Sequence, residues 1–358
     1  MVKAFARSSN LTELRHPPLA ADHVDAPHRW TALGDLQLES GETILDYRQS
    51  YVTHGELNAD RSNAILVCAS LTGTHHRLDF LVGPGKALDT TRWCIVATDA
   101  IGNGLSTSPS NSTRQPHMAF PRFTVRDMVH AQHRMLVEHL GIRRLQAVVG
   151  ASMGGMQALQ WAVSHPHFMQ SIVAMTPMAR TSPWAALVTS TARACLTADP
   201  AWNGTGFDRE PERGWRAYAG LMHGLVMRTP SAVEASMHGV DQAYPSFDEI
   251  VNRQRATCFD AHDYLYQSWA YDAHDVGTTP GYSDTSRALA AIVARTLILA
   301  PPLDLFNPVS SAREAAAGIS GARFVEIPSV QGHQSATSQS ATDAAFLNQT
   351  IARFLDEN

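Results

Sequence analysis

Short, continuous runs of apolar residues recur along the chain, separated by longer segments of mixed polarity. Most of these runs lack polar residues at every second position, which is the pattern expected of strands buried on both faces of a parallel sheet. The runs lie at residues 64–68, 93–97, 145–149, 170–175, 295–300 and 323–327. Each of them predicts a buried strand.

The segments between these runs have the spacing of apolar residues that is typical of helices. Residues 125–140 predict a helix that ends at Gly141, since glycine is common directly after a helix. Further helices are expected at residues 153–164, 309–318 and 341–356. Strands and helices that alternate at this spacing predict a doubly wound, mostly parallel α/β sheet.

The alternation stops between residues 180 and 288. This stretch is rich in Ala, Met, Tyr and Trp, and it contains few runs of the buried-strand type. It predicts a helical lid inserted over the sheet, whose core then consists of residues 31–179 and 289–358. Residues 1–30 are polar, contain prolines and show no period, so we expect a loosely attached N-terminal arm.

Composition and charge narrow the class of protein. With 358 residues, 44% apolar and 17% charged, the chain has the composition of an ordinary folded protein. A formal net charge of −5 and the lack of a long basic run exclude nucleic acid as an expected partner. The sequence has no signal-peptide core and no run of the roughly 18 apolar residues that a membrane span needs. We therefore expect a cytoplasmic protein without membrane contact.

One predicted strand and the helix after it are joined by a serine between glycines. Gly150, Ser152 and Gly154 form a G-x-S-x-G motif at this junction. A serine at such a strained turn presents its hydroxyl to a cleft, and glycine lets the neighbouring backbone approach closely. The helix that begins there directs free N–H groups and its positive dipole end towards any anion nearby. The motif predicts that Ser152 is a nucleophile.

Such a serine needs a base within hydrogen-bonding distance and a third group that orients the base. Asp304 directly follows the apolar run 295–300, and His333 lies a few residues after the run 323–327. The order serine, acid, histidine is that of α/β-hydrolases. Because the carboxyl ends of parallel strands meet at one edge of a sheet, we expect all three side chains to lie together there.

Attack of a serine on a carbonyl carbon also requires hydrogen-bond donors for the negative charge that develops on the carbonyl oxygen. One donor should be the backbone N–H of Met153, directly after the nucleophile. The other should come from the loop after an earlier strand, residues 70–73, and we assign it to the N–H of Leu71.

The remaining histidines, acids and cysteines form no motif of their own. Most of the 17 histidines are expected to have packing or solvated roles, but His75 and His76 follow the loop that should face the cleft. No metal site is expected, because this pair is too local and no H-E-x-x-H motif occurs. Asp260 and Asp275 in the insertion are poorly placed to replace Asp304. The four cysteines lack C-x-x-C spacing and are expected to be reduced thiols.

Several segments resemble the homoserine O-acetyltransferase family. They are residues 51–58, 71–73, 82–86, 150–157 and 198–204, and the similarity runs from about residue 45 to the C-terminus. The resemblance implies an α/β-hydrolase fold with a helical lid and a homodimer formed through the lid helices. It also implies a ping-pong reaction, in which the serine accepts an acetyl group from acetyl-CoA as co-substrate and passes it to a hydroxyl.

Three positions are expected to bind the substrate, Arg228, Gln334 and Gly220, and the last two depart from the family pattern. In the family an Asp usually follows the catalytic histidine and helps to hold the amino group of homoserine, but here Gln334 follows His333. The family's lid carries an arginine for the substrate carboxylate about eight residues before the position of Arg228, where this chain has Gly220. Each charge-assisted hydrogen bond contributes about 1.5–3 kcal/mol, so the loss of both disfavours homoserine. These departures favour a side branch of the family.

The sequence thus predicts an acyl-transfer enzyme that works through an acyl-enzyme on Ser152 and needs no bound cofactor. Its substrates would be a small ester or acyl-CoA and a small alcohol. Two alternatives stay open. The first is an esterase-type hydrolase, in which water resolves the acyl-enzyme. The second is a non-catalytic member of the family that only binds a ligand.

Overall fold

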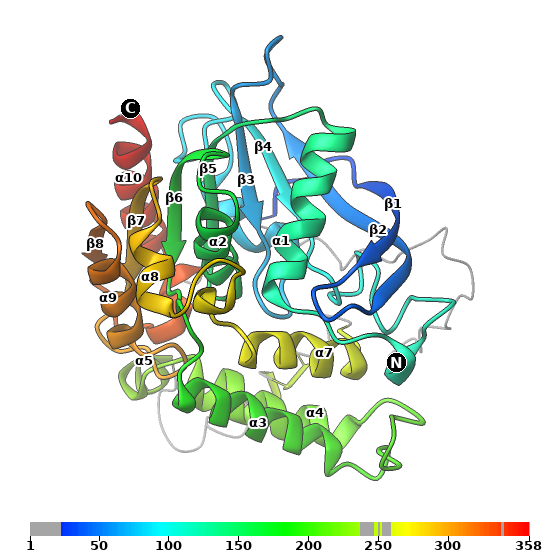
Figure 1. Ribbon diagram of the computed structural model, residues 1–358. Coiled ribbons are helices and arrows are strands. Elements are labelled where there is room, and N and C mark those ends of the chain that lie inside the picture. Colours follow the sequence, from blue (N-terminus) through cyan, green and yellow to red (C-terminus); the bar gives the residue numbers. More distant parts are fainter. Residues whose placement is uncertain (1–22, 237–246, 250, 253–258, 338–339, 358) are drawn as a thin grey trace.

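A single eight-stranded sheet forms the centre of the molecule in the computed structural model, which describes residues 23–236, 247–249, 251–252, 259–337 and 340–357 (Figure 1). The strand order is β1-β2-β4-β3-β5-β6-β7-β8. Pairing is antiparallel from β1 to β2 and from β2 to β4, and parallel through the rest of the sheet. The strands are β1 (Arg29–Gln37), β2 (Thr43–His54), β3 (Ala64–Cys68), β4 (Cys94–Thr98), β5 (Leu145–Ala151), β6 (Met169–Met175), β7 (Arg295–Ala300) and β8 (Arg323–Glu326).

Helices cover both faces of this sheet, as the alternating sequence pattern predicts. In the part of the chain that the structure describes, the α-helices are α1 (Val125–Arg134), α2 (Met153–Ser164), α3 (Pro183–Thr197), α4 (Glu212–Ala219), α5 (Pro230–Ser236), α7 (Ala261–Asp272), α8 (Thr285–Ala290), α9 (Val309–Gly318) and α10 (Ala341–Asp356). The helix predicted at residues 125–140 is α1 followed by a wider π-helical segment, η3 (Met135–His139).

Alternate residues of the central strands belong to two different hydrophobic cores. Leu66 and Val148 pack in one core with α1 and α2, whereas Val67 and Val149 pack in the other with α10. Figure 1 shows α1 and α2 in front of the sheet and α10 behind it. Apolar side chains on both faces explain why these strands read as continuous apolar runs. The prediction of a doubly wound, mostly parallel sheet is confirmed.

The predicted insertion is helical and lies beyond one end of the strands. Helices α3, α4 and α7 form a layer at the bottom of Figure 1, below the sheet. The chain leaves the core and re-enters it at one place, where two hydrogen bonds join the ends of the layer. Thr181 N–H donates to His274 O (2.9 Å), and Val276 N–H donates to Ala179 O (2.9 Å). The chain therefore returns to the core before residue 288, and α8 packs against α9.

The predicted N-terminal arm lies mostly outside the described residues. Its described end is attached to the core, since Val24 N–H donates to Asp79 Oδ2 (2.6 Å) and the ring of His23 stacks on His76. Strand β1 begins at Arg29, just inside the predicted arm. Within the described residues, no helix is long and apolar enough to cross a membrane.

Candidate active site

Ser152 occupies the sharp turn between β5 and α2. Its backbone has φ 57° and ψ −123°, a conformation that non-glycine residues rarely adopt. The flanking glycines are required by close packing. A Cβ on Gly150 would lie 2.1 Å from Gly154 O, and a Cβ on Gly154 would lie 2.4 Å from Cys68 O. The elbow can therefore form only with glycine at both positions.

The structure brings Ser152, His333 and Asp304 together. His333 Nε2 lies 2.9 Å from Ser152 Oγ, and His333 Nδ1 lies 2.8 Å from Asp304 Oδ2. The three residues are 3%, 1% and 6% exposed, so their contacts are shielded from bulk water. Asp304 follows β7, and His333 lies in the short helix η7 (Gly332–Ala336) after β8. All three residues thus lie at the carboxyl edge of the sheet, where the sequence predicted them.

Backbone amides fix the orientation of the acid. Asp304 Oδ1 accepts hydrogen bonds from the N–H groups of Phe306 (2.8 Å) and Asn307 (2.9 Å). These two bonds leave Oδ2 to His333, and the ring of Phe306 meets the imidazole edge-on at 5.1 Å. A carboxylate held in this way keeps the imidazole in the tautomer with a proton on Nδ1, so that Nε2 is the base.

A tyrosine from the lid reaches the loop of the acid. The hydroxyl of Tyr271, on α7, donates to Asn307 Oδ1, and Asn307 Nδ2 donates to Thr176 O (2.7 Å). Tyr271 is fully buried and stacks on Phe306. Burial, reinforced by the negative charge of Asp304, raises the pKa of Tyr271 well above its ordinary value, so the hydroxyl stays protonated.

The sequence analysis did not identify Tyr271 or Asn307. Asn307 lies three residues after Asp304 in the same loop, which is a local signal that could have been used. Tyr271 comes from the distant insertion and is one of several tyrosines there, so only the folded chain associates it with the acid.

The two predicted oxyanion donors lie on adjacent strand ends. Leu71 belongs to the loop after β3, and Met153 is the first residue of α2. Among the described residues, neither of their N–H groups donates to another group. The loop is held by Ser70 Oγ, which donates to Ala151 O (2.7 Å), and by Thr72 N–H, which donates to Gln267 Oε1 (3.0 Å). Both amides are therefore available to an oxyanion.

A buried carboxylate behind this loop also supports it. Asp99, the first residue after β4, accepts hydrogen bonds at Oδ1 from His75 N–H (2.9 Å) and from Asn103 Nδ2 (3.0 Å). Asn103 Nδ2 also donates to Gly73 O (3.1 Å). Burial alone would raise the pKa of Asp99, but the charge of His75 and hydrogen bonds from His28, His75 and Ser50 hold it well below its usual range. His75 is thus held by Asp99 directly after the loop that carries Leu71.

The three predicted substrate-binding positions lie in the lid and in the histidine loop. Gln334 N–H donates to Met227 O (3.1 Å), which joins the loop of His333 to the lid segment that carries Arg228. Arg228 donates from Nη2 to Ala232 O (2.9 Å) and to Ser236 Oγ (2.6 Å), both on α5. Gly220 begins the π-helical segment η4 (Gly220–Val226), and a Cβ there would lie 2.8 Å from the ring of Phe247. The structure thus brings Gln334 beside the Arg228 segment, while Gly220 lies against Phe247.

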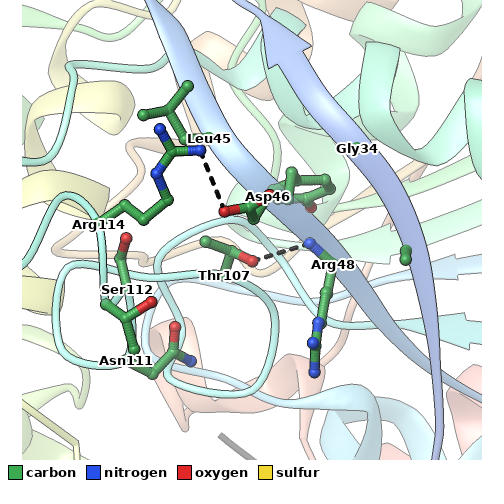
Figure 2. Close-up of a pocket in the computed structure, with 11 residues that line it drawn as sticks. Gly34, Leu45, Asp46, Arg48, Thr107, Asn111, Ser112 and Arg114 are labelled. Atoms are coloured by element: carbon green, nitrogen blue, oxygen red, sulfur yellow. Dashed lines mark hydrogen bonds and ion pairs between the residues drawn. The ribbon is translucent and has the colours of Figure 1, made fainter.

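A separate cavity of about 360 Å³ opens near the edge of the sheet (Figure 2). It lies between the first two strands and the loop of residues 107–114, and Arg48, Asp46 and Arg114 line it. The Arg114–Asp46 pair (3.4 Å) is more than half exposed and so contributes little. No triad residue lines this cavity, which is therefore distinct from the site around Ser152.

Comparison with known proteins identifies the family and the fold of the chain. A family model described as alpha/beta hydrolase fold matches residues 63–226. The chain is 32% identical to the homoserine O-acetyltransferase of Geobacter sulfurreducens, over 89% of this chain and 95% of that protein. The solved structure of the acetyl esterase MekB has a TM-score of 0.86 at 30% identity, covering 92% of this chain and 97% of that one. A homoserine O-acetyltransferase structure from Bacillus anthracis has a TM-score of 0.82 at 26% identity, covering 92% and 98%.

These similarities confirm the predicted α/β-hydrolase fold. The relatives include acetyl-transferring and acetyl-ester-cleaving enzymes on the same scaffold. Both reactions start with attack on an ester or thioester carbonyl and differ in the acceptor of the acyl group.

Proposed function

This chain belongs to the homoserine O-acetyltransferase family of α/β-hydrolase-fold proteins, and we propose that it moves an acetyl group through an acyl-enzyme on Ser152 to a small hydroxyl acceptor. At the coarser level it is an acyltransferase or a hydrolase. The observation that carries the proposal is the continuous hydrogen-bonded line from Asp304 through His333 to Ser152.

In the first half-reaction, Ser152 Oγ attacks the carbonyl carbon of the donor while its proton passes to His333 Nε2. The carbonyl electron pair moves onto oxygen, and the N–H groups of Leu71 and Met153 stabilise the resulting charge. The intermediate then expels the leaving group, a thiolate if acetyl-CoA is the co-substrate or an alkoxide if an ester is. The imidazolium of His333 protonates that group, and an acetyl ester remains on Ser152.

In the second half-reaction, His333 Nε2 takes the proton of the incoming hydroxyl, whose oxygen attacks the acetyl carbon. The same two N–H groups stabilise the second oxyanion. Collapse returns the bonding electrons to Ser152 Oγ, which recovers its proton from His333. If the hydroxyl belongs to an alcohol the reaction is a transfer, and if it belongs to water the reaction is hydrolysis.

The two residues that would contact the acceptor, Gln334 and Gly220, carry no charge, which favours an uncharged acceptor. Gln334 and Gly220 stand where the family pattern has an acid and an arginine, and neither can form an ion pair with an amino acid. We therefore propose a small alcohol without the ammonium and carboxylate groups of homoserine. Esterase-type hydrolysis is the second candidate, and the similarity to the acetyl esterase MekB favours it.

The acyl-enzyme can be tested by intact-protein mass spectrometry after mixing with an activated acetyl ester such as p-nitrophenyl acetate. The wild type is expected to gain one acetyl group, and Ser152→Ala is expected to gain none. If neither a mass adduct nor turnover occurs with any ester, the protein is a non-catalytic member of the family and the proposal fails.

Transfer and hydrolysis are separated by the response to acceptors. The enzyme is supplied with acetyl-CoA or an acetyl ester, and release of CoA or of the donor alcohol is followed with increasing amounts of small neutral alcohols and of homoserine. A transferase forms a new ester whose share of product rises with alcohol concentration. If release is unaffected by every acceptor, the enzyme is a hydrolase.

A further inference from the structure

Three ligand-type side chains from distant parts of the sequence converge beside the oxyanion loop. His28 precedes β1, His75 begins η1 (His75–Leu81), and Asp99 follows β4. One ligand atom from each of these residues lies within 4.8 Å of the other two. We call these three residues the His–His–Asp cluster. No local sequence motif reveals it, because its members come from three separate segments.

Both imidazoles of the cluster direct a nitrogen towards the same carboxylate oxygen. His75 Nδ1 lies 2.9 Å from Asp99 Oδ2, and His28 Nε2 lies 3.5 Å from it. The hydroxyl of Ser50 also contacts this oxygen and His28 Nε2. Asp99 and His75 are buried, whereas the side chain of His28 is 13% exposed and lies on the solvent side. The cluster is therefore largely buried, and His28 is its most exposed member.

The surroundings of the cluster resemble the outer shell of a protein metal site. Oxygen Oδ1 of Asp99 is held by His75 N–H and by Asn103 Nδ2, which leaves Oδ2 directed at the two imidazoles. Hydrogen bonds of this kind orient ligating carboxylates in metalloproteins. Two imidazole nitrogens and one carboxylate oxygen, with the hydroxyl of Ser50 beside them, form a ligand set that suits Zn²⁺.

A nearby buried histidine is an independent sign that the region is built for more than packing. His54 is only 7% exposed, and within the described residues its Nε2 has no hydrogen-bond partner. The rings of His75 and His76 are 4.2 Å apart. The cluster therefore lies within a group of closely packed imidazoles.

We propose that His28 Nε2, His75 Nδ1 and Asp99 Oδ2 bind one divalent transition-metal ion of the zinc type. Without the ion, hydrogen bonds hold these atoms near one another, and small ring movements would bring them to the roughly 2.0–2.2 Å bonds of such a site. The ion would immobilise Asp99 and, through Asn103 and Gly73, the loop that carries Leu71. It takes no part in proton or acyl transfer, and its effect would be on the position and stability of that loop.

The direct test uses the full-length protein after treatment with a chelator. Titration with Zn²⁺, in the presence of a competing weak chelator that suppresses surface binding, is expected to saturate at about one ion per chain. Zn²⁺ is also expected to raise the thermal unfolding midpoint, because it binds only the folded chain. Co²⁺ in the same site should give the intense visible absorption of four-coordinate cobalt.

The matched variants are His28→Gln and His130→Gln. His28 contacts no triad residue, and His130 lies on the exposed face of α1. His28→Gln is expected to weaken Zn²⁺ binding by at least about 10-fold and to lose the cobalt spectrum, while His130→Gln retains both. Stoichiometric binding that survives in His28→Gln would overturn the proposal. Absence of the cobalt absorption in the wild type would also overturn the proposal, and this result does not depend on whether His28→Gln folds. Hydrogen bonds alone would then hold the three side chains together.

Discussion

Two buried carboxylates of this protein each hold an imidazole, and their surroundings give them different tasks. Asp304 orients His333, whose other nitrogen meets the hydroxyl of Ser152. Asp99 contacts His75, whose ring lies against the rings of His28 and His76 rather than against a nucleophile. At the residue scale, the chemistry of an aspartate–histidine pair is therefore decided by what the far side of the ring contacts.

Replacement of the acid tests this assignment. In Asp304→Asn the side chain no longer selects the imidazole tautomer with a free Nε2, so kcat for an acetyl ester is expected to fall by about 10³–10⁴-fold. The matched control is Asp275→Asn, because Asp275 binds Gly277 N–H and Thr285 Oγ1 without contacting His333. Steady-state kinetics should show near-normal kcat for the control. Equal losses in both variants would mean that the effect is on folding and not on His333.

The triad was predictable from the sequence because each member directly follows a strand or lies shortly after one. The strand gives the side chain its place at the sheet edge, so chain order alone is sufficient. Tyr271, His28 and Asp99 were not identified, because their roles depend on contacts between separate segments: Tyr271 and Asn307 are 36 residues apart, and His28 contacts Asp99 from before the first strand. Their sequence neighbourhoods resemble those of ordinary packing residues.

At the scale of elements, the parallel strands and their helices were predicted, but the antiparallel pair β1–β2 was not. Strand β2 mixes buried and exposed positions and contains Asp46, Arg48 and Gln49, so it does not form a continuous apolar run. It pairs with β1 near the edge of the sheet, where one strand face meets solvent. Continuous runs reveal strands buried on both faces and miss strands of this kind.

Helix α7 contacts the acid loop through the hydroxyl and the ring of Tyr271, and the hydroxyl can be tested separately because Tyr271→Phe keeps the ring. Tyr271→Phe removes the hydrogen bond to Asn307 and leaves a buried amide oxygen without that donor, which should lower stability by about 1–3 kcal/mol. Because Asn307 N–H also holds Asp304, kcat should fall as well, with little change in KM.

The control for this variant lies on the same helix. Tyr266 donates to Phe120 O (2.6 Å) and, within the described part of the chain, forms no hydrogen bond or ring contact with the loop of Asp304, so Tyr266→Phe should lower stability without lowering kcat. Chemical denaturation and steady-state kinetics on both variants distinguish the two roles. A kcat for Tyr271→Phe that matches Tyr266→Phe would show that the lid hydroxyl does not position the acid.

His274 lies at the joined ends of the lid and should make the free energy of unfolding depend on pH. Burial lowers the pKa of His274 to about 4, whereas an unfolded histidine has a pKa of about 6.5. Between these values the unfolded chain binds a proton that the folded chain does not, so stability falls as the pH falls. Above about pH 6.5 both forms are neutral and this residue has no effect.

His274→Gln removes this titration and keeps a side chain able to donate to Met178 O. Its loss of unfolding free energy between about pH 7 and pH 5 should be smaller than that of the wild type by about 1–2 kcal/mol. Urea denaturation at the two pH values measures this difference. His139→Gln, at an exposed position after α1, should behave as the wild type does; an unchanged pH dependence in His274→Gln would contradict the assignment.

At the scale of the whole molecule, apolar side chains gather on the outside of the lid. Trp184 and Leu187 on α3 are 50% and 60% exposed, and Leu225 on the neighbouring segment η4 is 67% exposed. A patch of neighbouring exposed apolar side chains often marks an interaction surface, whereas a single exposed apolar side chain does not. Together with the homodimer that the family resemblance implies, they lead us to propose that two copies of the chain associate through their lids.

Light scattering coupled to size-exclusion chromatography tests this association. The wild type is expected to elute with the mass of a dimer, and the double variant Leu187→Glu/Leu225→Glu with that of a monomer, because buried charges oppose the contact. Val293→Glu is the control, since Val293 is 62% exposed and lies outside the lid. A wild type that is monomeric at micromolar concentration would rule the lid dimer out.

The joined ends of the lid, where Thr181 meets His274 and Ala179 meets Val276, have a consequence for protein engineering. A segment of roughly ninety residues leaves and re-enters the core at one place, so it can be exchanged as a cassette without altering strand order or register. Grafting the corresponding segment of a related transferase onto this core would keep Ser152 and its strand and would replace the lid residues near the site, Tyr271 among them. Under the proposed mechanism, acceptor choice would then depend on residues from both parts, Gly220 in the lid and Gln334 in the core.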